Sequence, residues 1–580
     1  MRSGRAGVGR WLAALLSLSL WTGCAAIPVT GPVMTEPRSR SGQNDSGVAI
    51  APGPPPQGAS VADIVDGFLL AMATFEPDYV TARLYLTDQA AQSWSPESEV
   101  LIYGDDAVPR VVDNQVTISA PIIGRLDVDG AFAGSTDPRW EHDFGLVRNE
   151  AGEWRIARPP AGLALSHYLF TSTFVRVDAY FFDHSWSVLV PDSRYLPRGD
   201  WGLASAVEAV LAGPASWLAP IVTSAVQPDL RLNGPPSLDG SGLVDIRLND
   251  TALELSTDQA TLLAVQFAAT LRQMPSVTAV SLTVGQTTQR TIVERLTIRS
   301  IESYDSVQTG SMALLYGLDA QGVVPLEGAL PPGRPSAGSD LRFGAIEAGA
   351  GLALSADGQE LAVATAGQVI RGWLVDAGTD RTVMEGSGLL RPQFGSDGQL
   401  WAMTSSPAST QLHLSQGETV RSLSPSGLLD RQVRSFCLSP DGQRMAVVAE
   451  IDGRLELGLL QVRRQSGQVV DLASWRPIRP LWESNALTVS DVSWVGSSAL
   501  AIIAARPSGI GQAYFIDVDG VDVQELGRPS DAPLIGLATA SRSGTTQLVV
   551  LDQEGGAWHY QDTHQWLSIG QSLVAVAYSG

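Results

Sequence analysis

The stretch that decides the fold occurs three times in the C-terminal half of the chain, as LSADGQ at residues 354–359, FGSDGQ at 394–399 and LSPDGQ at 438–443. An apolar run follows each copy, and the aspartates of successive copies are 40 and 44 residues apart. An Asp-Gly pair supplies the positive φ that a tight hairpin turn needs. Each copy therefore predicts a strand, a turn and a second strand. A hairpin that recurs every 40–50 residues or so is typical of a β-propeller blade.

Weaker copies of this pattern extend toward the C-terminus. One spans residues 492–498 and another spans 534–544, and each precedes an apolar run. The region 309–580 has about 270 residues, which at this period predicts a propeller of about six blades. A β-sandwich whose Asp-Gly turns coincide by chance is the alternative, but the near-constant spacing disfavours it.

The middle region, residues 164–308, predicts a compact α/β unit with the order β-β-α-β-α-β. Apolar residues alternate along 174–182, and helical spacing over 256–274 stops at a proline. The strings YFFD at 180–183 and LAGP at 211–214 resemble the GerMN domain of sporulation and germination proteins. That resemblance implies a binding module of the bacterial envelope and supplies no catalytic residue.

The region 60–163 predicts two helices followed by an antiparallel sheet. Helical spacing covers 61–72 after a Ser60 cap, and a second helix is expected over 78–94. A strand is expected over 116–123, and a hairpin closes around 149–152. Helices followed by a curved sheet resemble the NTF2-like cone fold, an α+β fold in which a pocket is common.

The N-terminus has the pattern of a secretory signal. Arg2, Arg5 and Arg10 precede an apolar run of ten residues, which is too short to be a permanent membrane span of about 20 residues. The segment that ends at Cys24 resembles a lipobox, although Trp21 stands where Leu is usual. An ordinary signal peptide that happens to precede a cysteine is the alternative.

The lipobox resemblance implies cleavage after Gly23 and lipidation of Cys24. Residues 1–23 are then a signal peptide, and residues 24–59 are a lipidated, Pro- and Gly-rich tether. We expect the protein to be anchored by lipid at the extracytoplasmic face of the cell membrane, because stable attachment needs two or more acyl chains and a lipidated cysteine supplies them. Cys437, in an apolar run, is expected to be a buried core residue.

Composition excludes several classes of function. The chain has 38 basic and 60 acidic residues, a net charge of −22, and every basic residue is Arg. Loss of the signal peptide leaves 35 basic residues and a charge of −25. Nucleic-acid binding needs clustered cations, so no nucleic-acid partner is expected. Two cysteines, one of them lipidated, leave no intramolecular disulfide.

The sequence contains no constellation that supports catalysis, and we expect no enzyme activity, cofactor or metal. His-Glu-x-x-His, Gly-x-Ser-x-Gly, Walker A and dinucleotide-binding motifs are all absent. His559 and His564 are five residues apart with Asp562 between them in an expected surface loop, and a metal site there is disfavoured. Asp517, Asp519 and Asp522 do not match an EF-hand loop, so a solvated turn is favoured over a calcium site.

Over nearly its whole length the chain resembles the actinobacterial lipoprotein LpqB family, with the GerMN strings and the propeller repeats as the specific part. The resemblance implies an accessory protein that binds the extracytoplasmic domain of the sensor histidine kinase MtrB. Through the response regulator MtrA it would influence the cell envelope and division. Two alternatives are a hydrolase and a binder of cell-wall polysaccharide or peptidoglycan. For the latter, Trp373, Trp401 and Trp494 could be stacking platforms, although packing between blades is favoured for them.

Overall fold

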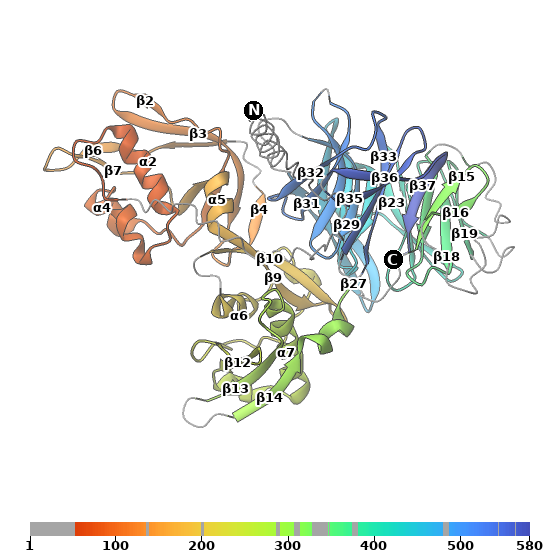
Figure 1. The fold of residues 1–580 in the computed structure, drawn as a ribbon, viewed down its shortest axis with the longest axis horizontal. Helices are drawn as coiled ribbons and strands as arrows, with labels where there is room; N and C mark the ends of the chain where they lie inside the picture. Colours follow the sequence, from red (N-terminus) through yellow and green to blue (C-terminus); the bar gives the residue numbers. More distant parts are fainter. Residues whose placement is uncertain are drawn as a thin grey trace, which may run out of the picture. The chain divides into compact units, whose positions relative to one another are not determined.

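The fold is described from a computed structural model (Figure 1). The described residues are 53–134, 139–198, 202–285, 290–306, 314–326, 346, 349–373, 381–479, 487–507, 509–542, 545–562 and 564–579. Pro52–Gly580 clusters as one compact unit.

The C-terminal region is all β, and its described residues form six antiparallel sheets. Five of them have four strands each, and the sixth has three. In chain order, the first two four-stranded sheets consist of β17 (Gly351–Leu354), β18 (Glu360–Ala364), β19 (Gln368–Trp373) and β20 (Arg381–Glu385), and of β21 (Gln393–Phe394), β22 (Leu400–Ser405), β23 (Thr410–Gln416) and β24 (Thr419–Leu423). The next two consist of β25 (Gln432–Leu438), β26 (Arg444–Ile451), β27 (Arg454–Gln465) and β28 (Gln468–Ile478), and of β29 (Thr488–Val495), β30 (Ala499–Ala505), β31 (Gln512–Asp517) and β32 (Val523–Gly527). The last consists of β33 (Leu534–Arg542), β34 (Thr545–Asp552), β35 (Ala557–Asp562) and β36 (Gln565–Gly570).

The six sheets close into a ring because the last strand of the chain returns to the first sheet of the region. Strand β37 (Leu573–Tyr578) pairs with β15 (Leu315–Asp319), which pairs in turn with β16 (Val323–Pro325). Strands β15, β16 and β37 lie together in Figure 1. β37 also contacts β17 and β33, the first strands of the two neighbouring sheets. The expected propeller of about six blades is therefore present.

The repeated Asp-Gly turns have the geometry that the sequence predicts. Gly358, Gly398 and Gly442 all have positive φ, between 62° and 73°. In each copy the aspartate accepts a hydrogen bond of 2.8–3.0 Å from the backbone N–H of the following glutamine. The turns join the first two strands of three successive sheets.

The middle region has two parts, a long hairpin and a four-stranded sheet. The hairpin consists of β9 (Phe174–Phe182) and β10 (Leu189–Pro197). The sheet has the order β11-β12-β13-β14, with bounds Ser237–Leu238, Leu243–Leu248, Ala279–Val284 and Arg290–Thr297. Helices α6 (Leu203–Leu211) and α7 (Thr257–Leu271) pack together and bury their apolar faces (Figure 1). Strand β14 was not expected, because polar residues dominate its exposed, edge-strand sequence.

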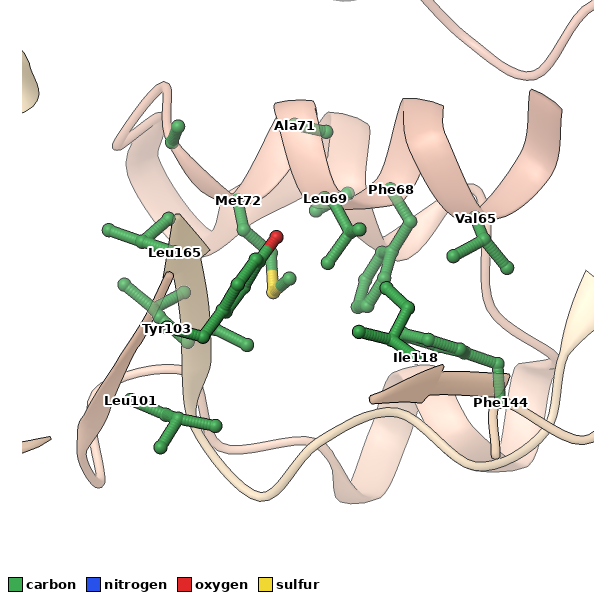
Figure 2. Packing of buried hydrophobic residues seen from close by; sticks show 14 of the residues in the cluster. Val65, Phe68, Leu69, Ala71, Met72, Leu101, Tyr103, Ile118, Phe144 and Leu165 are labelled. Carbon is green, nitrogen blue, oxygen red and sulfur yellow. The ribbon is translucent and has the colours of Figure 1, made fainter. Parts of the chain in front are cut away.

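The N-terminal region packs α2 (Val61–Met72) on a sheet with the order β2-β3-β1-β8, and β4 and β5 also pair with β3 (Figures 1 and 2). Further elements are α5 (His167–Thr173) and the hairpin β6–β7. The strands β1 to β8 span Val100–Tyr103, Arg110–Val112, Gln115–Leu126, Phe132–Gly134, Arg139–Asp143, Leu146–Arg148, Trp154–Ile156 and Leu163–Ser166. The predicted boundary at residue 163 falls at the start of β8.

The continuous helix expected over 78–94 is wrong. The structure has a short 3-10 turn, a one-turn helix α3 (Val80–Arg83) and α4 (Asp88–Ser93) instead. Asp78 and Tyr79 have positive φ, which an α-helix does not accept. The backbone of Leu86 forms a β-bridge with Ile156 of β7, which interrupts the helix at residue 86. A separate helix, α4, then begins after the Thr87 cap.

Removal of residues 573–580 tests the ring closure. The deletion exposes β15 and removes the buried side chains of Leu573, Val576 and Tyr578, so we expect the C-terminal region to lose about 5 kcal/mol of stability or more. The urea midpoint and the rate of trypsin cleavage measure this loss. A chain that lacks Gly580 alone is the control and should unfold as the full chain does. Equal midpoints for both deletions would show that β37 does not close the ring.

Candidate functional site

The β9–β10 hairpin joins the middle region to the propeller through a charged contact, here called the seam. Nη1 of Arg176 lies 2.5 Å from Asp517 of the propeller, and Nη2 donates to the Ser498 carbonyl at 2.9 Å. The Ser498 hydroxyl donates in return to Asp178 at 3.0 Å, and Asp178 lies 3.3 Å from Arg176. The three charged side chains are thus each held by a residue of the other region.

The seam continues along β10. The Tyr195 hydroxyl donates to Asp519 at 3.4 Å, and Asp519 also accepts a close hydrogen bond from Arg476. The Arg476 guanidinium lies 5.5 Å from the ring centroid of Trp217, and Trp217 Nε1 donates to the Ser474 carbonyl at 3.0 Å. A tryptophan and a tyrosine from the middle region therefore contact two blades of the propeller.

One of the repeated Asp-Gly turns carries part of the seam. Asp441 pairs at 2.5 Å with Arg444, and both side chains are buried. Arg444 donates to the carbonyls of Ser497 at 2.7 Å and of Pro191, near the start of β10, at 3.4 Å. Its guanidinium also lies 5.0 Å from the ring centroid of Trp494. The turn of the third repeat thus positions a cation against the middle region.

A second buried arginine on β10 contacts the N-terminal region. Arg194 is 1% exposed and donates to the carbonyl of Asp129, in the loop before β4, at 3.2 Å. It also donates to Asp192 at 2.7 Å and to the Gly213 carbonyl at 2.9 Å. The β10 strand therefore contacts both of the other regions.

Burial shifts the titration of the seam. It raises the pKa of Asp517 and of Asp192, although the arginine beside each one lowers it in part. Burial also raises the pKa of Tyr195 far above its ordinary value. Burial alone would lower the pKa of Arg176, but Asp178 and Asp517 raise it well above its ordinary value. Arg176 therefore stays charged, and the seam needs its carboxylates ionised.

Two cavities accompany this arrangement. One of about 520 Å³ lies along the seam, and its lining includes Arg444, Asp192, Asp519 and Trp475. The other, of about 510 Å³, lies within the N-terminal region, and Asp66 and Leu69 of α2 are among its lining residues. Both have the size of small-molecule sites.

The structure places the predicted tryptophans in the core. Trp401 is 0% exposed and Trp494 is 5% exposed, and each belongs to a cluster shared by adjacent sheets. Trp373 is half-buried beside Arg371. Packing between blades, the favoured interpretation, is therefore confirmed for Trp401 and Trp494.

The aspartate cluster behaves differently from the prediction. The solvated turn expected for Asp517 and Asp519 is wrong, because both carboxylates pair with arginines in the seam. His559 hydrogen-bonds to Gln547. Within the described ranges, no three His, Cys, Asp or Glu side chains converge closely enough to hold a metal ion. Cys437 is a free, buried thiol, as expected, and Cys24 lies outside the described residues.

The sequence did not single out the seam residues Arg176 and Arg444. A signal was present nonetheless. Arg176 and Asp178, like Asp192 and Arg194, are opposite charges two residues apart on apolar strands, which places both on one face of the hairpin. Charged pairs on one face of an apolar strand indicate a packed contact that needs them.

Comparisons with known proteins agree with the domain order. Residues 54–171 match the family described as the N-terminal domain of lipoprotein LpqB, 178–289 match "Sporulation and spore germination", and 315–575 match the LpqB beta-propeller domain. The described part of the chain has no helix that is both long and apolar enough to cross a membrane.

Relatives named "Lipoprotein LpqB" align along nearly the whole chain. The one from Cutibacterium acnes is 29% identical over 96% of this chain and 97% of its own. The one from Streptomyces avermitilis is 26% identical over 97% and 96%. Among solved structures, TolB from Acinetobacter baumannii aligns with 70% of this chain and 99% of its own at 12% identity, with a TM-score of 0.34.

Replacement of Arg176 by Leu tests the seam. The change leaves Asp178 and Asp517 mostly buried without their cation, so we expect it to lower the free energy of unfolding by about 3 kcal/mol. Scanning calorimetry of the variant should also show separate unfolding transitions for the regions, whereas the parent chain should unfold in one coupled transition.

Arg231→Leu in the same region is the matched control. Its ion pair with Asp229 is 73% exposed on the arginine side, so its loss should change stability by less than about 1 kcal/mol. Equal effects of the two substitutions would contradict a structural role for the seam.

Proposed function

The chain belongs to the lipoprotein LpqB family, and from this premise we propose that it is a lipid-anchored extracytoplasmic protein that regulates a sensor histidine kinase of the MtrB type. In this proposal residues 1–23 are the signal peptide, and Cys24 carries the lipid. Through the kinase and the response regulator MtrA the protein influences the cell envelope and division.

The observation that carries the proposal is the seam. A regulator must favour one conformation of its target, and the shift equals its difference in affinity for the two conformations. Buried ion pairs hold the regions of this protein together, so it loses little conformational freedom on binding. More of the free energy of the contact then remains to separate its affinities for the two conformations of the target. The lipid tether raises its effective concentration near membrane receptors.

The role proposed here is binding and not catalysis. The relatives are named as lipoproteins, and the matching domains are a propeller and a GerMN-type domain. Cell-wall polysaccharide binding is the weaker candidate, because Trp401 and Trp494 are buried and offer no stacking surface. The resemblance of residues 60–163 to the NTF2-like fold stays a prediction. So do the boundaries 164–308 for the GerMN-like domain and 309–580 for the propeller.

Substitution of Cys24 by Ala tests the anchor. We expect the variant to lose incorporation of labelled fatty acid and to leave the membrane fraction, since acyl chains are its attachment. Cys437→Ala is the control, because this buried thiol has no part in attachment. Unchanged membrane association of the Cys24 variant would contradict lipid anchoring.

Purification of the full chain from membranes after crosslinking tests the partner. We expect a sensor histidine kinase to be recovered with it, and recovery with the Arg176→Leu variant to fall several-fold, because separated regions bind with a larger loss of freedom. The Arg231→Leu variant should recover as much kinase as the parent. Membranes that contain a kinase of this type yet yield none in the purified fraction would overturn the proposal.

A further inference from the structure

The wall of the N-terminal cavity continues into exposed apolar surface, here called the rim, which consists of residues 107–112 and Tyr168. Ala107, Pro109 and Tyr168 line the cavity itself. Val108 stands between the first two of these and is 75% exposed, and Tyr168 is 69% exposed. Single exposed apolar side chains are ordinary, but a contiguous group of them beside a cavity marks an interaction site.

Strand β2 extends the apolar core of this region out to the rim. Val111 lies directly opposite Val116 of β3 in the antiparallel pairing, so both side chains are on the same face of the sheet. Val116 is fully buried, whereas Val111, at the end of the sheet, is exposed. Ile118, two residues further along that face of β3, lines the cavity. Figure 2 shows Ile118 with Leu69 and Tyr103, which also line the cavity, on the side of α2 that packs on the sheet. The core therefore opens to solvent at this edge.

Exposed apolar side chains concentrate in the N-terminal region. Of the seventeen large apolar residues that are exposed in the described part of the chain, nine lie between residues 70 and 168. Strand β2 is also at the end of its sheet, where an extended segment of another chain can pair with it. A small molecule inside the cavity would leave Val108, Val111 and Val112 in water, so the rim suits a protein partner that covers them.

The charge of this region selects the kind of partner. Residues 60–163 contain seven arginines and seventeen acidic residues, which leaves a net charge of −10. Exposed carboxylates of Asp66, Asp105 and Asp106 lie in the cavity lining or next to it, beside the exposed Arg110. A surface of this sign attracts basic groups and repels acidic ones. It disfavours an anionic lipid surface, which binds basic segments, and it disfavours a second copy of this acidic chain.

We propose that the rim and its cavity bind a protein segment in which an apolar side chain is flanked by basic residues. The apolar side chain enters the cavity against Leu69 and Ile118, as anchor residues of interfaces fill pockets on their partners. The basic groups meet the carboxylates around it. The inference rests on the proposed function, because the partner that the tether keeps within reach is the extracytoplasmic domain of the kinase.

Photo-crosslinking from the full chain in its own membranes tests this surface. With p-benzoylphenylalanine at position 108, we expect a crosslink to the kinase through a segment that has adjacent apolar and basic residues, as identified by mass spectrometry. The same probe at position 128 is the matched control and should give no such crosslink. Val128 is 73% exposed in the same region but lies outside both the rim and the cavity lining.

The crosslinked product separates this inference from the proposed function. Recovery of the kinase with no crosslink from position 108 would overturn the rim as the binding surface and leave the regulatory proposal standing. A crosslink from position 108 to lipid alone, or to a second copy of this chain, would also overturn the rim. A crosslink to another identified protein, through a segment of the expected chemistry, would keep the rim and overturn the kinase as its partner. The absence of both kinase and crosslink would overturn both.

Two substitutions at exposed positions measure the apolar contact. Val108→Asp places a carboxylate in the contact without disturbing the core, so kinase recovery should fall about tenfold. Val128→Asp should recover as much kinase as the parent chain. Equal losses from the two substitutions would show that added negative charge, and not the rim, weakens binding. Thermal unfolding of each purified variant confirms that it is folded.

Two further substitutions measure the contribution of charge. Asp66→Asn removes a carboxylate from the cavity lining, so recovery should fall several-fold and should depend less on salt concentration. Asp88→Asn is the matched control, because it removes an exposed aspartate of α4 that does not line the cavity, and it should leave recovery unchanged. An effect of Asp88→Asn as large as that of Asp66→Asn would contradict basic recognition at the rim.

Discussion

The arrangement of this protein depends on how a buried guanidinium is satisfied. A guanidinium has five N–H donors in a planar fork and stays charged in any protein environment, so burying one requires acceptors in several directions. Arg194 and Arg444 meet this need with a carboxylate plus backbone carbonyls, and Arg176 does so with two carboxylates and a carbonyl. In each case at least one of the acceptors belongs to a different region of the chain. Nε of Arg194 and of Arg444 stays without a partner among the described residues.

Charged contacts of this kind define a geometry more than they add stability. An apolar contact of equal area would be as stable or more so, because desolvation of the ions offsets much of their attraction. An apolar surface, however, tolerates sliding, whereas a fork that must meet Asp441, Ser497 and Pro191 fits only one placement. The directional contacts therefore suit a protein whose proposed role is to present a fixed surface to a receptor.

Sequence reasoning succeeded where structure is local and failed where partners are distant. The Asp-Gly turns, the α2 cap and the core position of Cys437 depend on near neighbours or simple burial, and each was predictable. The helix expected over 78–94 failed because a strand pairing seventy residues away, Leu86 with Ile156, outweighs helix propensity. Asp517 and Asp519 looked solvated because their partners Arg176 and Arg476 are far apart in sequence.

The two cavities differ in how their carboxylates are neutralised. Along the seam, Asp192 and Asp519 are buried and each pairs with an arginine, so the chain itself neutralises these two carboxylates. In the N-terminal cavity Asp66 and Asp105 are exposed, so water solvates both carboxylates without a cation from the chain. Pairing with an arginine is therefore needed where the contact between regions buries a carboxylate, as it buries Asp192 and Asp519.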